Sequence, residues 1–198
     1  MARPRTFDEE RALAAAMHTF WEKGYEATST QDLCEATGLG RSSIYNTFKS
    51  KHDLFARALA HYIETTTAAQ LAVLEDARLS GAERIRVLLD RVVEGEAEHR
   101  AQGRHAGCLT VNTTVELAGR DARAAEMLER DTARRLAALR GAIEAGRRDG
   151  SIVSSRDAGA LARFVNAAIG GMRVSSQGGA DRAALEAIAE VTMDALTR

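Results

Sequence analysis

Proline is almost absent from this chain. The only one, Pro4, lies within the first six residues, and the rest of the sequence is rich in Ala, Leu, Arg and Glu, which favour helices. No run of alternating β-branched residues competes with a helical interpretation. Hydrophobic residues make up 45% of the chain, enough for a sizeable core. The composition therefore predicts an all-α protein and excludes disorder as the default state.

Cysteines and long apolar runs are also scarce. The two cysteines, Cys34 and Cys108, are too few for a disulfide framework and indicate a reducing compartment. The first ten residues, MARPRTFDEE, lack the apolar segment of a signal peptide, and no apolar run reaches 18 residues. We therefore expect a soluble, cytoplasmic protein that does not associate with a membrane.

Residues arranged for catalysis are missing as well. The sequence contains no nucleophile–base pair, no phosphate-binding loop and no carboxylate pair in a catalytic context. The net charge is −1, so the molecule as a whole is not a basic, polyanion-coating protein. We expect neither an enzyme nor a cofactor.

Aromatic residues are few and unevenly distributed. Of the nine Phe, Trp and Tyr residues, only Phe164 follows Tyr62, so the beginning of the chain has an aromatic core and the remainder an aliphatic one. Helical periodicity predicts about nine helices, three in the first module and six in the second. We place the first domain at residues 1–50 and the second at residues 51–198. The charged, glycine-containing stretch EGEAEHRAQGRHAG after Val93 is predicted to be a connection.

The segment from Thr28 to Lys51 predicts a helix-turn-helix. Ser29 and Asp32 have the spacing of a helix-capping box, Gly38 fits the turn, and Ile44 and Phe48 form the buried side of a second helix over residues 41–48. No acidic residue occurs between Gly38 and His52, as expected for a small nucleic-acid footprint. The second helix of such a motif enters the major groove of DNA, so this segment predicts DNA binding.

Polar side chains outside the buried faces of this motif are the candidate DNA contacts. Arg41 can pair with guanine and Asn46 with adenine, whereas Lys51, at the start of the next helix, can bind a phosphate together with backbone N–H groups. Arg3 and Arg5 are candidates for a minor-groove arm, or form a plain polar arm. The alternative for every position is an ordinary solvated residue. The predicted DNA-binding residues are Thr28, Ser29, Thr30, Arg41, Ser42, Ser43, Tyr45, Asn46, Thr47 and Lys51.

The segment GYEATSTQDLCEATGLGRSSIYNTFKSKHDLF, which begins at Gly24, resembles the TetR family of bacterial transcriptional regulators. The stretch GCLTVNTTVEL at 107–117 is similar to a pattern in one branch of that family. The resemblance implies a homodimer with an N-terminal DNA-binding domain and a C-terminal domain that binds a small effector and thereby releases DNA. Cys34 stands where the family usually has alanine. Asn46 and Thr47 replace a bulky aromatic or histidine pair, so the operator sequence does not carry over.

Candidate ligand-binding residues lie on the predicted sixth, seventh and eighth helices. They combine apolar side chains with a few polar ones, as small-molecule pockets do, although such stripes are also typical of plain core. They are Cys108, Asn112, Met127, Phe164, Asn166 and Met172. Cys108 begins a helix, where N–H dipoles favour a thiolate, so it is also a candidate sensor of electrophiles or oxidants. His99, His105 and Cys108 could supply three metal ligands, but no fourth occurs at a matching interval, and we expect no metal site.

The last two predicted helices are the candidate dimer interface. Small residues on the eighth helix allow close helix approach, and the ninth has an apolar stripe; packing within one chain is the alternative. The predicted interface residues are Ala168, Gly171, Leu185, Ile188, Val191 and Leu196. Together with these patterns, the resemblance to the TetR family implies a homodimeric repressor that binds a palindromic operator and is released by a small effector. The alternatives are regulation through the Cys108 thiol and a helical protein-interaction module that does not bind DNA.

Overall fold

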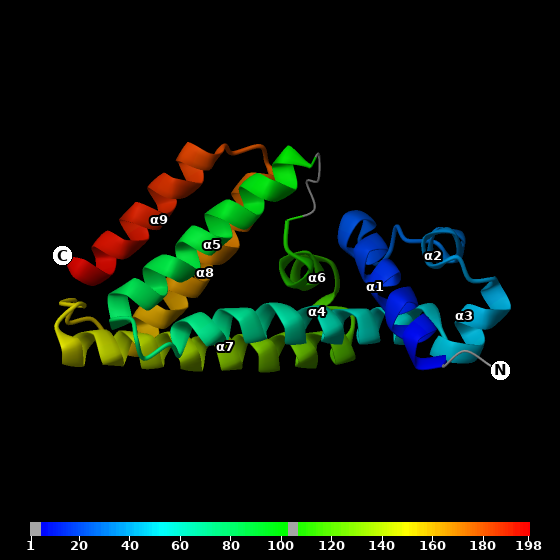
Figure 1. Ribbon diagram of the computed structural model, residues 1–198, viewed down its shortest axis with the longest axis horizontal. Coiled ribbons are helices and arrows are strands. Elements are labelled where there is room, and N and C mark those ends of the chain that lie inside the picture. Colours follow the sequence, from blue (N-terminus) through cyan, green and yellow to red (C-terminus); the bar gives the residue numbers. More distant parts are fainter. Residues whose placement is uncertain (1–4, 103–106) are drawn as a thin grey trace. The chain divides into compact units, whose positions relative to one another are not determined.

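The computed structural model describes residues 5–102 and 107–198, and all regular structure in these ranges is helical (Figure 1). The all-α prediction is therefore confirmed. The helices are α1 (Arg5–Lys23), α2 (Thr30–Thr37), α3 (Arg41–Phe48), α4 (Lys51–Leu74), α5 (Gly81–Ala101), α6 (Leu109–Leu117), α7 (Ala122–Asp149), α8 (Ala158–Gln177) and α9 (Arg182–Thr197). No helix among the described residues is both long and apolar enough to cross a membrane.

Capping residues fix the helix starts that the sequence predicts. Ser29 caps α2 and Ser80 caps α5, and in both cases the acidic residue three positions later bonds back to the cap backbone. These reciprocal bonds satisfy N–H groups that have no partner within the helix. Helix α2 ends at Gly38, whose φ of 68° lies in the left-handed region that glycine adopts without strain.

Helix α5 is longer than the sequence pattern suggests. We predict a connection after Val93, but the helix continues to Ala101. Gly95 costs a helix only about 1 kcal/mol. Burial of the apolar Val92 and Val93 on one side of α5 outweighs that cost. His99 consequently lies on a helix, whereas His105 lies outside the described residues.

The chain forms two compact units. The first comprises residues up to Thr65 together with Cys108–Leu128, and the second comprises Thr66–Gly107 together with Glu129–Arg198. The unit boundaries fall inside α4 and α7, so neither helix belongs to one unit alone. The functional boundary that we place near residue 50 stays a prediction.

The first unit is built around aromatic side chains. Phe20, Phe48 and Phe55 are buried. The rings of Phe20 and Phe55 meet edge to face with their centroids 5.1 Å apart, a favourable geometry for two aromatic rings. This core joins α1 to the start of α4 and supports the short helices α2 and α3.

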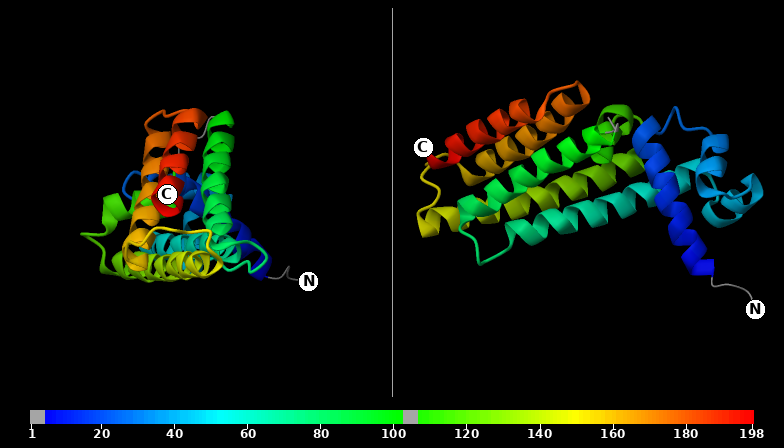
Figure 2. Two further views of the ribbon diagram at one scale, coloured as in Figure 1. Left: turned by 90° about the vertical axis from the view of Figure 1, so that its left-hand side faces the viewer. Right: turned by 45° about the horizontal axis from the view of Figure 1, so that its top comes forward.

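The second unit has the predicted aliphatic core. Helices α5, α8 and α9 lie side by side, and α9 runs back along α8 in the opposite direction (Figure 2). At the start of α5, Gly81 approaches α7 so closely that an added Cβ would lie 2.2 Å from the backbone nitrogen of Gly146. At its other end, the Arg100 guanidinium donates to the carbonyl oxygens of Gly179 and Ala180. Both ends of α5 are therefore fixed within this unit.

Candidate nucleic-acid interface

Helix α3 exposes a polar face because its two large apolar residues are buried. Ile44 and Phe48 are one turn apart, and both lie in the core of the first unit. We call the remaining side chains the recognition face. It consists of Arg41, Ser42, Ser43, Asn46 and Thr47, which are exposed, and Tyr45, which is half-buried. This is the orientation that the sequence predicts for DNA contacts.

Contacts between α2 and α3 hold the centre of the recognition face. The hydroxyls of Thr30 and Tyr45 lie 3.0 Å apart and share a hydrogen bond. The guanidinium carbon of Arg41 lies 5.8 Å from the centre of the Tyr45 ring, a cation–π distance. Tyr45 therefore orients Arg41 while its own hydroxyl is already bonded to Thr30.

Thr28 does not lie on this surface. Its side chain is 0% exposed, and its hydroxyl donates to the Gly24 carbonyl oxygen over 2.6 Å. The prediction that Thr28 contacts DNA is therefore replaced by a structural role, because the hydroxyl closes the turn between α1 and α2. Ser29, next in the chain, is exposed and caps α2.

Lys51 lies in the first turn of α4, beside the turn that follows α1. Its ammonium is 4.5 Å from the centre of the Tyr25 ring and donates to the Glu26 carbonyl oxygen over 3.5 Å. The Ser50 hydroxyl accepts the N–H of Asp53 and caps the helix. The cation thus lies at a helix N-terminus, where free N–H groups favour a phosphate.

The charge of Asp32, the acidic residue in the first turn of α2, is compensated within the fold. The Lys23 ammonium lies 2.6 Å from its carboxylate. Hydrogen bonds from Lys23 and then from Ser29 hold the pKa of Asp32 well below its usual range, and the same Lys23–Asp32 bond raises the pKa of Lys23. The negative charge of Asp32 is therefore paired with Lys23 within the fold, next to Ser29, a proposed phosphate contact.

The predicted ligand-binding residues are divided between the two units. In the first unit, Cys108 is 4% exposed and precedes α6, with its sulfur 3.1 Å from the Thr110 hydroxyl and 3.5 Å from the Tyr62 hydroxyl. Asn112 and Met127 are half-buried. The Cys108 thiol is thus enclosed by hydroxyl groups rather than directed to solvent.

In the second unit, Asn166 belongs to a polar network. Its side-chain oxygen accepts from the Arg135 guanidinium over 2.7 Å, and Arg135 pairs with the buried Asp131 over 3.0 Å. Asp131 also accepts from the Thr67 hydroxyl over 2.5 Å. Burying a charge is costly unless it is paired and hydrogen-bonded, as it is here. Met172, in contrast, is plain core.

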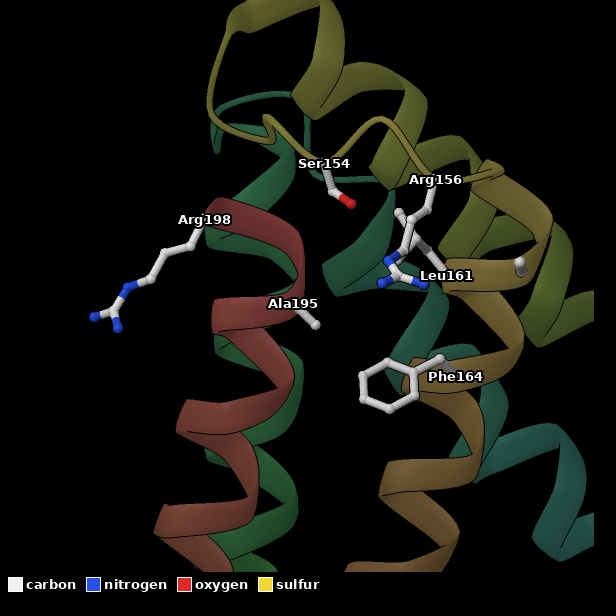
Figure 3. A pocket seen from close by; sticks show the side chains of 7 residues that line it. Ser154, Arg156, Leu161, Phe164, Ala195 and Arg198 are labelled. Atoms are coloured by element: carbon white, nitrogen blue, oxygen red, sulfur yellow. The ribbon is translucent and has the colours of Figure 1, made fainter.

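Phe164 lies on the outside of α8 rather than in the interior. It is 45% exposed and lines a groove of about 470 Å³ together with Leu161, Ala195 and Arg156. Figure 3 shows the Phe164 ring and the Arg156 guanidinium pointing into the space between α8 and α9, while Arg198 points away from it. Helical periodicity places Phe164 on an apolar stripe but does not reveal that its ring is uncovered.

The predicted dimer residues fall into two groups. Gly171 and Val191 are exposed and Ala168 and Ile188 are half-buried, so these four face outward at least in part. Leu185 and Leu196 are instead buried in the core of the second unit, because their side of α9 packs on α5 and α8. Their predicted place in an interface is therefore corrected to a place in the core.

Two glutamates have structural roles that the sequence does not predict. Glu96 is only 6% exposed and continues the buried side of α5. The spacing gives an indication of this burial, because Glu96 follows the apolar Val92 and Val93 by one helical turn. Glu116 accepts the backbone N–H groups of Tyr25 and Glu26, which are 91 and 90 positions away, and no local pattern indicates such a pairing. No group of three potential metal ligands occurs among the residues that the structure describes.

Family models match both parts of the chain. Residues 12–58 match the model of bacterial regulatory proteins of the tetR family, and residues 81–192 match a tetracyclin repressor-like C-terminal domain. The HTH-type transcriptional repressor ComR of Escherichia coli (strain K12) is 33% identical over 193 residues, covering 96% of this chain and 90% of that protein. YezE of Bacillus subtilis (strain 168), an uncharacterized HTH-type transcriptional regulator, is 34% identical over 167 residues, covering 84% of each chain.

A solved structure is similar over the whole length. It is a cysteine-substituted form of the TetR family transcriptional regulator CifR in complex with 26-bp double-strand operator DNA. The TM-score is 0.80 at 31% identity, covering 98% of this chain and 100% of that one.

Proposed function

The chain belongs to the TetR family of bacterial transcriptional regulators, and from that premise we propose that it is a homodimeric repressor of a palindromic DNA operator. The recognition face of α3 reads base edges in the major groove. Lys51 and the N-terminal end of α2 at Ser29 and Thr30 bind backbone phosphates. The C-terminal part of the chain binds a small effector that releases the protein from DNA.

The observation on which this proposal rests is the form of the recognition face. Burial of Ile44 and Phe48 leaves the polar side of α3 outward, and the neighbouring helices α2 and α4 begin with the Ser29 cap and the Lys51 cation. The complex of the similar CifR with operator DNA supports the same use of this domain.

An exposed apolar stripe supports dimerisation. It comprises Phe164, Gly171 and Val174 on α8 and Val191 on α9. In the proposed dimer the stripe of one copy packs against the same stripe of the other about a two-fold axis, as in most homodimers. The dimer then presents two recognition faces to half-sites about 34–36 Å apart, or a multiple of that distance, on one side of the duplex.

Release by an effector is a shift between two conformations. The effector must bind the DNA-incompetent conformation more tightly than the DNA-competent one, and DNA in turn weakens effector binding by the same factor. Asn112 and Met127 of the first unit stay proposed effector-binding residues, whereas Met172 belongs to the core of the second unit.

Binding-site selection from random duplex DNA tests this function. We expect the protein to enrich a palindrome, and Arg41→Ala to weaken binding to it while the variant remains folded. Enrichment of no sequence would instead favour the helical protein-interaction module. As a DNA-binding regulator the protein acts in the cytoplasm and has no enzymatic activity of its own.

A thiol-based regulator is the second candidate, because Cys108 lies at the start of α6 between two hydroxyl groups. Hydrogen bonds from hydroxyls stabilise a thiolate. Treatment with an electrophile or an oxidant should then release operator DNA from the wild type but not from Cys108→Ser. Equal release of both proteins contradicts this candidate.

A further inference from the structure

One carboxylate joins α6 to the turn between α1 and α2. Glu116, near the end of α6, accepts the backbone N–H of Tyr25 over 3.0 Å and that of Glu26 over 2.7 Å. Both carboxylate oxygens are engaged, one by each N–H. Hydrogen bonds to a charged acceptor are roughly twice as strong as neutral ones, so this pair fixes the turn firmly.

Gly24 leaves room for the Glu116 carboxylate. Its φ of 80° belongs to the left-handed region, and a Cβ at this position would lie 3.0 Å from the nearer Glu116 oxygen. A side chain there would be strained in itself and would press on the carboxylate. The turn is therefore shaped to receive Glu116.

The turn held by Glu116 positions both proposed phosphate-binding sites. Downstream, the Thr28 hydroxyl donates to the Gly24 carbonyl oxygen and so sets the start of α2. Across the turn, the Tyr25 ring and the Glu26 carbonyl oxygen hold the Lys51 ammonium. Burial beside these groups raises the pKa of the Tyr25 hydroxyl, as expected for a ring enclosed in the fold.

We propose that Glu116 is a positioning residue for DNA binding, which holds the Tyr25–Glu26 turn so that Lys51 and the start of α2 meet the DNA backbone. Glu116 touches no DNA itself and acts through the turn. This inference rests on the proposed DNA-binding function.

A double-mutant cycle on operator binding tests the proposal. The proteins are the wild type, Glu116→Ala, Lys51→Ala and the double variant, with the selected operator duplex as ligand in fluorescence anisotropy. Glu116→Ala should weaken binding at least about tenfold. Because Lys51 depends on the turn that Glu116 holds, the double variant should bind more tightly than the product of the two single effects predicts.

Two controls separate positioning from general loss of structure. Asn46 lies on the exposed side of α3, and its side chain is not part of the Thr30–Tyr45–Arg41 contacts, so the effects of Glu116→Ala and Asn46→Ala should multiply to within about twofold. Glu129→Ala, on the exposed side of α7, should bind like the wild type. If Glu116→Ala does not fold, Glu116→Gln replaces it in both cycles, since the amide keeps the size of the side chain but accepts only one of the two N–H groups.

Each possible result of the double-mutant cycles either supports or overturns the positioning role of Glu116. Unchanged affinity of the folded Glu116 variant, or effects that multiply equally with Lys51→Ala and Asn46→Ala, would overturn the positioning role. If the effect of the Glu116 variant departs equally from multiplication with both partner substitutions, Glu116 has a purely structural role. That result would also overturn the positioning role. A wild-type protein that binds no DNA contradicts the proposed function itself, which is a distinguishable result.

Discussion

Replacing Val191 by aspartate tests where a second copy of the chain binds. Val191 lies on α9 with 66% of its surface exposed and belongs to the exposed apolar stripe. In the proposed dimer this surface is covered by the partner. An aspartate there loses the apolar contact and places a charge in an apolar interface.

The size of the effect follows from the exposed area. Burying a whole valine side chain contributes about 1.5–3 kcal/mol, so burying two thirds of it contributes about 1–2 kcal/mol. Two-fold symmetry places the residue in the interface twice, which gives about 2–4 kcal/mol. The dissociation constant of the dimer should therefore rise about 30- to 1,000-fold.

Sedimentation velocity at micromolar concentration measures this change. Val115→Asp is the matched control, because Val115 is the most exposed valine among the described residues, at 84%, and belongs to α6 rather than to the stripe. We expect Val191→Asp to be largely monomeric and Val115→Asp to remain dimeric. An unchanged dimer of Val191→Asp, or a monomeric wild type, would refute the reasoning.

Further predictions concern DNA, pH and the interior. Lys51→Ala should lower the slope of log affinity against log salt by about 1 per subunit, and an unaltered slope would exclude a phosphate contact. The N–H of Ala124, followed by a bond from His52, holds the pKa of Asp121 below its ordinary value of 3.8. Its stabilising effect is thus present at neutral pH and lost as the pH falls below about 4. Asp121→Asn should lower the free energy of unfolding at pH 7. The free energy of unfolding of this variant should also decrease less than that of the wild type on acidification, as measured by urea titration. Leu185→Ala should lower that free energy by about 2–5 kcal/mol.

Local signals in the sequence predict the N-terminal region well. The capping box of Ser29 and Asp32, the turn at Gly38 and the buried pair Ile44 and Phe48 depend on residues only three or four positions apart. Such interactions are decided within one helical turn, so the spacing of residue types is enough to predict them.

Predictions that depend on packing between residues far apart in the sequence are less accurate. Periodicity shows that α9 has an apolar side, but Leu185 faces the core while Val191 faces outward, and the sequence does not distinguish them. The sequence suggests that Thr28 is a polar surface residue, but in the folded chain its hydroxyl donates a hydrogen bond to the Gly24 carbonyl oxygen. The partners of Glu116 are about 90 residues upstream, and only the folded chain brings them together.

The salt dependence of binding to a selected operator tests the central claim most directly. We predict tight, sequence-specific binding whose affinity falls steeply as salt increases, with a log–log slope of about −0.9 for each phosphate contact. Arg41→Ala should abolish the preference for the selected sequence and leave most of that slope. The absence of sequence-specific binding at every salt concentration, or an affinity independent of salt, would contradict the account.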